Sequence, residues 1–236
     1  MKYNRILLKL SGEAIGGPDG VGLDSDVMAN FADQVASLAS KGVQVAIVIG
    51  GGNVFRGIQG TKSGFDRVRG DQMGMLATVI NSIGLSQFIK KAGVDAEVYT
   101  STPMEPMAKY YTRDNALKSL AKGRVVLIAG GTGNPFFTTD TAGALRACEL
   151  GADALLKGTK VDGVYTADPK KDPTATRYST ITFEKCLQDD LQIMDRTAFT
   201  LCHENNLPIV VFNMNNVGDF ERILLGEPAG TIISNE

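Results

Sequence analysis

The chain has 236 residues, of which 43% are hydrophobic and 21% charged, and its 24 basic and 26 acidic side chains give a net charge of -2. This composition suits one large α/β domain, and without a basic excess we expect no nucleic-acid partner. No apolar run approaches the ~20 residues that span a bilayer, so we expect no membrane anchor and no signal peptide. Cys148, Cys186 and Cys202 form no CxxC pair and His203 is the one histidine. This pattern predicts buried thiols in a reducing, cytoplasmic compartment and disfavours a His/Cys metal site.

Short apolar runs alternate with helical patterns along the chain. In chain order we predict a strand at 5–10, a helix from 24 to 41, a strand at 43–49, a helix from 71 to 93, a strand at 94–99, a helix at 115–121, a strand at 124–129, a helix at 141–150, a strand at 152–157, helices at 183–189 and 195–205, a strand at 209–212, a helix at 217–225 and an edge strand at 231–233. The stretch 161–182 is predicted to form short hairpins. This order predicts an α/β fold: one three-layer αβα domain over residues 1–236 with a mostly parallel central sheet.

Glycine-rich or small-residue segments follow several of these strands. In such sheets, ligands bind at the carboxyl ends of the strands, so the clusters indicate a ligand site at one edge of the sheet. GxxxxGK[ST] is absent, no GxGxxG follows the first strand, and the HRD and DFG segments of protein kinases are missing. A P-loop NTPase, a dinucleotide-binding fold and a protein kinase are therefore disfavoured.

The segments 9–12 (KLSG) and 50–53 (GGGN) are candidates for phosphate binding. Lys9 ends a buried strand where it can reach a phosphate, and the N–H groups of the following turn can bind an anion. A snorkelling lysine beside an ordinary turn fits the first segment equally well. In the second, three glycines let a phosphate approach the backbone closely and Arg56 adds a planar cation. A flexible turn would need only one glycine, so we favour function there.

The segment 130–140 (GGTGNPFFTTD) combines glycines, a proline, two adjacent hydroxyls and an acid near the start of a helix. The hydroxyls of Thr138 and Thr139 can hold an anion, and Phe136 and Phe137 can wall an aromatic ring. Singly, Asp140 fits a plain N-cap and the phenylalanines fit core packing. Those interpretations explain the Thr-Gly-Asn-Pro part poorly, so we expect the loop to bind a ligand.

The segment 157–169 (KGTKVDGVYTADP) follows the next strand, where Lys157 adds a second cation to the edge that carries Lys9. Tyr165 can flank an adenine and Asp168 can accept a hydrogen bond from a ribose hydroxyl. An Asp-Gly turn and an Asp-Pro turn that close a hairpin explain the same residues without a ligand. Asp71 stands at the predicted start of its helix, where an ordinary helix cap explains an acidic residue without a ligand.

Six segments together resemble the bacterial uridylate kinases of the amino acid kinase superfamily, in order and without large gaps from residue 5 to about residue 233. KLSG and GGGN indicate only the superfamily, whereas GDQMGMLAT and GTGNPFFTTD resemble the uridylate branch. The resemblance implies an amino acid kinase-like fold and transfer of the ATP γ-phosphoryl group to UMP, with Mg²⁺ delivered on ATP. The segments are RILLKLSGEA (5–14), VIGGGNVFRG (48–57), GDQMGMLATVIN (70–81), GTGNPFFTTD (131–140), TKVDGVYTADP (159–169) and PIVVFNMN (208–215).

The resemblance also implies site residues, with Asp71 on the ribose hydroxyls of UMP and the 132–139 loop on its base. The implied ATP-binding residues are Lys9, Leu10, Ser11, Gly12, Gly52, Arg56, Thr159, Tyr165 and Asp168. The implied UMP-binding residues are Gly51, Asp71, Thr132, Gly133, Asn134, Pro135, Phe136, Phe137, Thr138 and Thr139. We expect the catalytic residues to be two main cations, a third cation and two acids that orient them, namely Lys9, Arg56, Lys157, Asp140 and Asp195. No protein cage for a metal ion is expected.

Relatives of this kind are cytoplasmic homohexamers, and many are activated by GTP and inhibited by UTP. The chain carries Ser86, Gln87 and Lys90 where GTP-activated relatives usually have an Arg-Asp pair and a more variable third residue, so GTP activation stays open. Two rival functions remain. Another kinase of the superfamily, acting on acetylglutamate, glutamate, aspartate or carbamate, would share KLSG and GGGN only. A non-catalytic nucleotide-binding regulator would not need Lys9, Arg56, Asp140 and Lys157 together.

Overall fold

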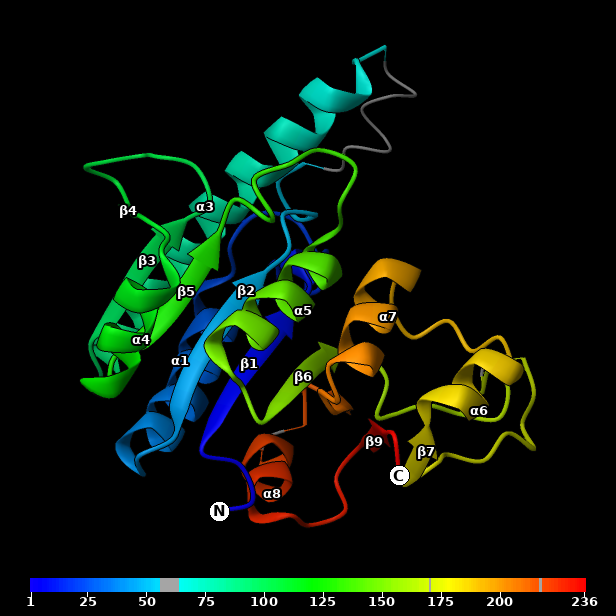
Figure 1. Ribbon diagram of the computed structural model, residues 1–236. Helices are drawn as coiled ribbons and strands as arrows, with labels where there is room; N and C mark the ends of the chain where they lie inside the picture. Colours follow the sequence, from blue (N-terminus) through cyan, green and yellow to red (C-terminus); the bar gives the residue numbers. More distant parts are fainter. Residues whose placement is uncertain (56–63, 170, 217) are drawn as a thin grey trace.

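The computed structural model describes residues 1–55, 64–169, 171–216 and 218–236, so Arg56 lies outside the described residues. Within them, nine strands form one sheet in the order β4-β3-β5-β2-β1-β6-β8-β9-β7 (Figure 1). Neighbouring strands are parallel, except for the antiparallel pair β8 and β9. The strands are β1 (Arg5–Leu10), β2 (Gln44–Ile49), β3 (Ala96–Thr100), β4 (Lys109–Tyr110), β5 (Val125–Ala129), β6 (Ala154–Thr159), β7 (Thr180–Thr182), β8 (Ile209–Asn213) and β9 (Thr231–Ser234).

Helices cover both faces of this sheet (Figure 1). One core lies beneath α1 (Ser25–Ser40), α3 (Arg67–Lys91) and α8 (Asp219–Leu225). The opposite core lies beneath α4 (Arg113–Ala121), α5 (Thr139–Leu150), α6 (Phe183–Gln188) and α7 (Arg196–Glu204). A short 3₁₀ turn, η1 (Gly12–Ala14), follows β1. The predicted mostly parallel, three-layer αβα architecture is confirmed.

Strand β1 shows how the sequence sets these layers. Ile6, Leu8 and Leu10 point into the core beneath α1, whereas Leu7 points into the core beneath α5, and all four are 0% exposed. This alternation is the two-residue period of a strand, and burial of both faces is typical of a parallel sheet. By the same period, Lys9 lies on the α5 face, as a charged residue within a buried strand.

Helix α3 begins at Arg67, one turn earlier than the predicted start at Asp71. The reason is that Asp66 caps the helix, accepting a hydrogen bond from the Arg69 N–H at 3.2 Å. Asp71 is therefore not a capping residue but lies inside the first turns, on a face that the helix can direct toward a ligand.

Two further boundaries differ from prediction at the site. Helix α5 begins at Thr139 rather than at 141, because the Thr138 hydroxyl accepts hydrogen bonds from the first-turn N–H groups. Strand β6 continues to Thr159, so Lys157 lies within the strand and not at its end. The stretch 161–182 holds one antiparallel bridge, between Tyr165 and Arg177, before the short strand β7. No helix in the described part of the chain is both long enough and apolar enough to cross a bilayer.

Glu97 on β3 gathers polar partners near the edge of the sheet. Its carboxylate accepts hydrogen bonds from Tyr99 Oη at 2.8 Å, Ser119 Oγ at 2.5 Å, Lys109 Nζ at 2.7 Å and Arg124 Nη1 at 2.7 Å. Burial raises the pKa of this carboxyl, but the hydrogen bonds from Lys109, Ser119 and Tyr99 outweigh it and lower the pKa to about 2. The ionised carboxylate therefore stabilises the fold.

Glu97→Gln is expected to lower the free energy of unfolding at pH 7 by about 1–2 kcal/mol, since the exposed Lys109 partner is screened by solvent. Because the folded-state pKa of Glu97 lies below the ordinary 4.5, its contribution to the free energy of unfolding is complete above pH 4.5 and is lost as the pH falls toward 2. Urea unfolding of wild type, this variant and the exposed-site control Glu204→Gln at pH 7 and pH 3 tests this. An equal deficit at both pH values would contradict it.

Candidate active site

Two lysines and an aspartate form a cluster near the carboxyl ends of the central strands. Lys9 on β1 and Lys157 on β6 stand opposite each other in the parallel register. Asp140 on α5 bridges them, with Lys9 Nζ 2.6 Å from Oδ1 and Lys157 Nζ donating to Oδ2 at 2.7 Å. The three side chains are only 12–13% exposed. One carboxylate thus orients two ammonium groups at the same edge of the sheet.

The local sequence explains this placement. Gly143 lets α5 lie close to β1, because a Cβ at this position would come within 3.3 Å of Lys9 Cγ. Thr138 caps α5, its hydroxyl accepting hydrogen bonds from the N–H groups of Asp140 at 3.1 Å and Thr141 at 3.2 Å. Asp140 therefore sits in the first helical turn, where the helix dipole favours a negative charge.

Burial and charge act against each other in this cluster. Burial raises the pKa of Asp140, but the positive charges of Lys9 and Lys157 outweigh it, and the pKa of the carboxyl lies below its ordinary value. Burial, together with the positive charge of Lys9, lowers the pKa of Lys157 although Asp140 raises it. The carboxylate is therefore ionised at neutral pH, and the cations it orients lie where water screens them weakly, so they act strongly on a nearby phosphate.

Glycines bring two turns close together beside Lys9. A Cβ at Gly12 would lie 2.4 Å from the Gly50 carbonyl oxygen, and a Cβ at Gly51 would lie 2.7 Å from the Gly74 carbonyl oxygen of α3. The Gly50 N–H donates to the Leu10 carbonyl at 2.8 Å. Side chains at these glycines would force the turns apart. The predicted residues Leu10, Ser11, Gly12, Gly51 and Gly52 are thus brought together as adjoining stretches of backbone.

A first cavity lies between the N-terminal half of α3 and the loop before α5. It is lined by most of the residues predicted to bind UMP, namely Gly51, Asp71, Thr132, Asn134, Phe137, Thr138 and Thr139. Gly133, Pro135 and Phe136 belong to the same loop, but they are not among the described residues that line the cavity. Phe137 is half exposed at the wall, a position from which it can cover a ring bound in the cavity.

Asp71 is held at the rim of this cavity by two partners. Arg67 Nε lies 2.9 Å from each carboxylate oxygen, and the Phe136 N–H donates to Oδ2 at 2.7 Å. The guanidinium of Arg67 also lies over the Phe136 ring, 5.5 Å from its centroid. Phe136 takes a φ of 71°, a left-handed conformation that is unusual outside glycine. The acidic side chain of α3 is thereby joined to the loop across the cavity.

Asp195 caps α7 and connects it to α5. Its carboxylate accepts hydrogen bonds from Thr138 Oγ1 at 2.5 Å, Thr141 Oγ1 at 3.0 Å and the Ala198 N–H at 2.9 Å. We expected this acid to orient cationic side chains. Its hydrogen bonds hold hydroxyl groups in the capping turn that carries Asp140, and its negative charge also acts on Lys157, whose pKa it raises.

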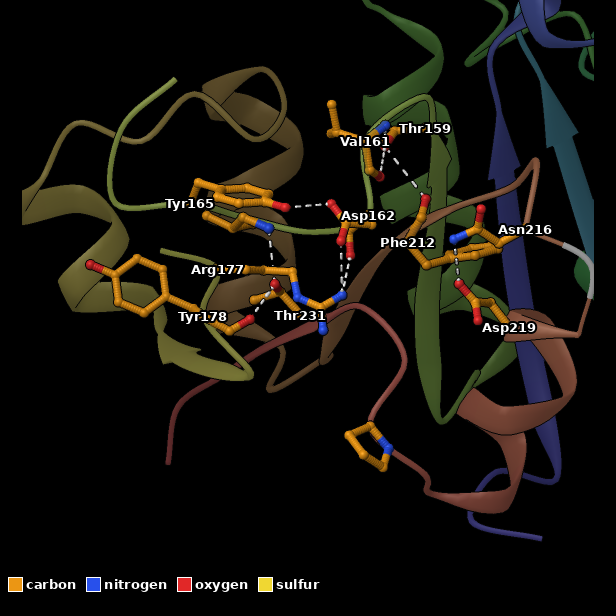
Figure 2. Close-up of polar contacts among 12 residues, drawn as sticks. Thr159, Val161, Asp162, Tyr165, Arg177, Tyr178, Phe212, Asn216, Asp219 and Thr231 are labelled. Carbon is orange, nitrogen blue, oxygen red and sulfur yellow. Dashed lines mark hydrogen bonds and ion pairs between the residues drawn. The ribbon is translucent and has the colours of Figure 1, made fainter. Parts of the chain in front are cut away.

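A second cavity of about 470 Å³ lies beyond β6, with a volume in the range of small-ligand sites. Thr159, Tyr165 and Asp168, the predicted ATP-binding residues of this region, all line it. Tyr165 Oη donates to Asp162 at 2.7 Å, and Arg177 contacts the same carboxylate at 3.3 Å (Figure 2). That hydrogen bond raises the pKa of Tyr165, and it fixes the ring at the wall.

The lysine cluster stands between the two cavities. Lys157 Nζ also donates to the Ile193 carbonyl at 2.5 Å, and Ile193 lines the second cavity. Thr139, next to Asp140 in the chain, lines the first. The structure therefore places paired cations next to residues that line each of the two cavities. This arrangement can hold two anionic ligands with their charged groups facing each other.

Sequence reasoning missed two partners of the predicted acids. Arg67 lies one helical turn before Asp71, and this i,i+4 spacing was the signal for it. A helix that begins at Asp71, as predicted, excludes Arg67 and with it this signal. Thr141 holds Asp195 across a separation of 54 residues, and no local pattern in the chain indicates such a contact.

Comparison with known proteins places this architecture in a family. The model of the amino acid kinase family matches residues 4–213. The chain is 54% identical over 234 residues to a protein named uridylate kinase from Bacteroides thetaiotaomicron, with 99% of each chain covered. It is 52% identical to a uridylate kinase from Porphyromonas gingivalis, covering 99% of this chain and 98% of that one.

Solved structures of UMP kinases are similar to this chain over nearly their whole length. A crystal structure of UMP kinase from Bacillus anthracis matches with a TM-score of 0.97 at 38% identity, over 100% of this chain and 98% of that one. UMP kinase from Ureaplasma parvum matches with a TM-score of 0.93 at 35% identity, over 99% and 100% of the two chains. The chain therefore belongs to the amino acid kinase family and, within it, to the uridylate kinases.

Proposed function

We propose that the protein transfers the γ-phosphoryl group of ATP to UMP, giving UDP and ADP for pyrimidine nucleotide synthesis. The observation that carries this proposal is the Lys9–Asp140–Lys157 cluster between two cavities, in a chain more than half identical to proteins named uridylate kinase. ATP occupies the side of β6 and the KLSG turn, and UMP occupies the cavity between α3 and the 130–138 loop.

Phosphoryl transfer between two nucleotides depends on positioning and on positive charge. The phosphate of UMP is already ionised near neutral pH, since its second pKa is about 6, so no general base is required. Lys9 and Lys157 stabilise the charge on the transferring group, with Arg56 as a further cation, and backbone N–H groups of the glycine turns assist. Asp140 orients the two lysines, and Asp195 keeps the turn that carries Asp140 in place.

We assign the nucleotide contacts from the predicted residues and from their places beside the two cavities. Thr159, Tyr165 and Asp168 bind the adenosine of ATP, while Leu10, Ser11, Gly12 and Gly52 lie along its phosphates. Asp71 accepts hydrogen bonds from the ribose hydroxyls of UMP, and the loop from Thr132 to Thr139 binds the base.

The carboxylates of the site suit Mg²⁺ delivered with ATP better than a resident metal. The two oxygens of Asp140 face lysines, and those of Asp195 face hydroxyl and N–H groups. These acids are thus already engaged, which suits an ion held mainly by phosphates and water. When bound, the ion neutralises phosphate charge.

ADP release from Mg-ATP tests the function, with UMP, CMP, dUMP, N-acetylglutamate, glutamate and aspartate offered in parallel. We expect turnover with UMP and little with the amino acids. Turnover with an amino acid alone would assign the chain to another branch of the family. Binding of ATP without turnover on any acceptor would favour a non-catalytic regulator.

Asp71→Asn is expected to raise the KM for UMP by about 10- to 100-fold, the loss expected for a hydrogen bond to a charged group. The KM for ATP should stay within about twofold, since Asp71 lies at the other cavity. Steady-state kinetics with UMP and dUMP check this, and the effect should be smaller for dUMP, which lacks one ribose hydroxyl. An equal rise in both nucleotide KM values would remove Asp71 from ribose recognition.

We also propose that the chain acts as a single domain in a cytoplasmic homohexamer. On α3, Leu76 and Ile80 are about half exposed one helical turn apart, an apolar surface that suits assembly. Ser86, Gln87 and Lys90 line a further cavity against β3 and β4, where GTP or UTP could act as effectors. Sedimentation and effector titration test these assignments.

A further inference from the structure

A buried pair of amide side chains, Asn53 and Asn81, takes no part in the mechanism described above. Asn53 follows the three glycines after β2 and is 3% exposed, and Asn81 lies in the middle of α3 and is 0% exposed. Buried polar groups are costly unless they are hydrogen-bonded, so their contacts indicate what the pair does.

The two side chains bond to each other in both directions. Asn81 Nδ2 donates to Asn53 Oδ1 at 2.7 Å, and Asn53 Nδ2 donates to Asn81 Oδ1 at 3.0 Å. Each amide has one further N–H, and both are used: Asn81 donates to the Gly50 carbonyl at 2.7 Å and Asn53 donates to the Gly22 carbonyl at 2.6 Å. All four N–H groups of the pair are thus satisfied, which fixes its orientation.

These bonds tie the glycine turn on the ATP side to α3. Gly50 begins that turn and lies against Gly12, in the turn after β1. A Cβ added at Gly12 would come within 2.4 Å of Asn53 Oδ1. Asn81 is the member of the pair that stands on the helix. Loss of its donors would remove the hydrogen bonds from α3 to Gly50 and Asn53, so that Gly50 would be held by its bond to Leu10 alone among those named here.

The same face of α3 holds the other substrate loop. Thr78 lies one turn before Asn81, and its hydroxyl accepts a hydrogen bond from the Gly130 N–H at 2.8 Å. Asp71, at the rim of the first cavity, lies at a spacing that places it on this face as well. One straight helix thus contacts the turn beside Lys9 and the start of the loop that leads to Asp140.

We propose that Asn81 is a positioning residue for phosphoryl transfer, which sets the glycine turn of the donor side at a fixed place relative to the acceptor loop without touching either nucleotide. This inference rests on the proposed kinase function. Small misplacements of reacting groups cost far more in turnover than in binding. Loss of the Asn81 donors should therefore reduce kcat while both nucleotides still bind.

Asn81→Asp tests this with little change in volume, because it replaces the Nδ2 donor by an oxygen facing two other oxygens. Asn81→Ser is a neutral second variant whose hydroxyl is too short to reach Gly50. Ser82→Ala is the matched control: Ser82 is the next residue of α3, is 0% exposed, and its hydroxyl has no hydrogen-bond partner among the described residues. The measurements are steady-state kinetics per folded molecule and hydrogen–deuterium exchange.

We expect either Asn81 variant to lower kcat by about 10- to 100-fold, with the KM for ATP and UMP changed less than about threefold. Amide exchange should rise across 50–54 but not across 130–138, which Thr78 still holds, and Ser82→Ala should match wild type in both assays. A folded Asn81 variant with wild-type kcat, or an equal loss in Ser82→Ala, would overturn the inference. If wild type itself does not phosphorylate UMP, the proposed function fails, and unchanged exchange across 50–54 would then overturn the positioning role separately.

Discussion

Lys9→Ala is expected to lower kcat by roughly 10²–10³-fold, the cost of losing one donor to a transition-state anion. The ammonium of Lys9 is mostly buried, is aimed by Asp140 from 2.6 Å and faces the same edge as Lys157. Its charge is therefore preorganised in a weakly screened place, which is where such groups contribute most to rate.

The Lys9→Ala protein should remain folded, because Asp140 keeps its ion pair with Lys157. Steady-state kinetics with Mg-ATP and UMP, together with a thermal melt, check both parts of this expectation. Lys122→Ala, which removes an exposed lysine after α4, is the control for loss of a positive charge. Turnover of Lys9→Ala close to that of wild type would remove Lys9 from the mechanism.

Asp140→Asn should have the second large effect, on stability as well as on rate. It removes the one negative charge between Lys9 and Lys157 while keeping the shape of the side chain. Breaking a buried ion pair by removal of one partner typically costs about 3–5 kcal/mol, because the remaining charge is left uncompensated. We expect a deficit of that order in the free energy of unfolding at pH 7. Turnover should fall too, since the lysines lose the group that orients them.

Asp26→Asn is the matched control for this change. Asp26 occupies the same position in the first turn of α1, two residues after its cap, but is exposed. It therefore reports the loss of a helix-dipole interaction alone.

The effect of Asp140→Asn on stability should depend on pH. Because the folded-state pKa of Asp140 lies below its ordinary 3.8, the contribution of Asp140 to stability is complete above pH 3.8 and is lost as the pH falls further. Chemical unfolding should show the deficit narrowing below pH 3.8, and a deficit as small as that of Asp26→Asn would contradict the bridging role.

The layered fold was predictable because its signals are local. The run of β5 is apolar throughout, which indicates a strand buried on both faces, and helical periods separate such runs along the chain. Two helix starts that the sequence placed too late depend on capping side chains. Asp66 and Thr138 begin helices earlier than the apolar pattern does, since a cap adds a turn that carries no hydrophobic signal.

The candidate site was predictable in its parts, from glycines and charges at the ends of strands. Its arrangement was not. Lys9 and Lys157 face each other because of the register between β1 and β6, and Asp195 bonds to Thr141 of a distant helix. Arg56, which we expect to act as a further cation, lies outside the described residues and stays a prediction.

The sequence by itself therefore determined the alternation of the main strands and helices, the mostly parallel sheet and the edge that carries the glycine turns, because periodicity and glycine placement are properties of neighbouring residues. Only the tertiary structure decided which distant side chains meet: the bridge from Asp140 to two lysines, the contact of the Phe136 N–H with Asp71, and the amide pair of Asn53 and Asn81. Such contacts depend on strand register and on helix packing. These are set by the burial of the whole core, and no short segment of the chain encodes them.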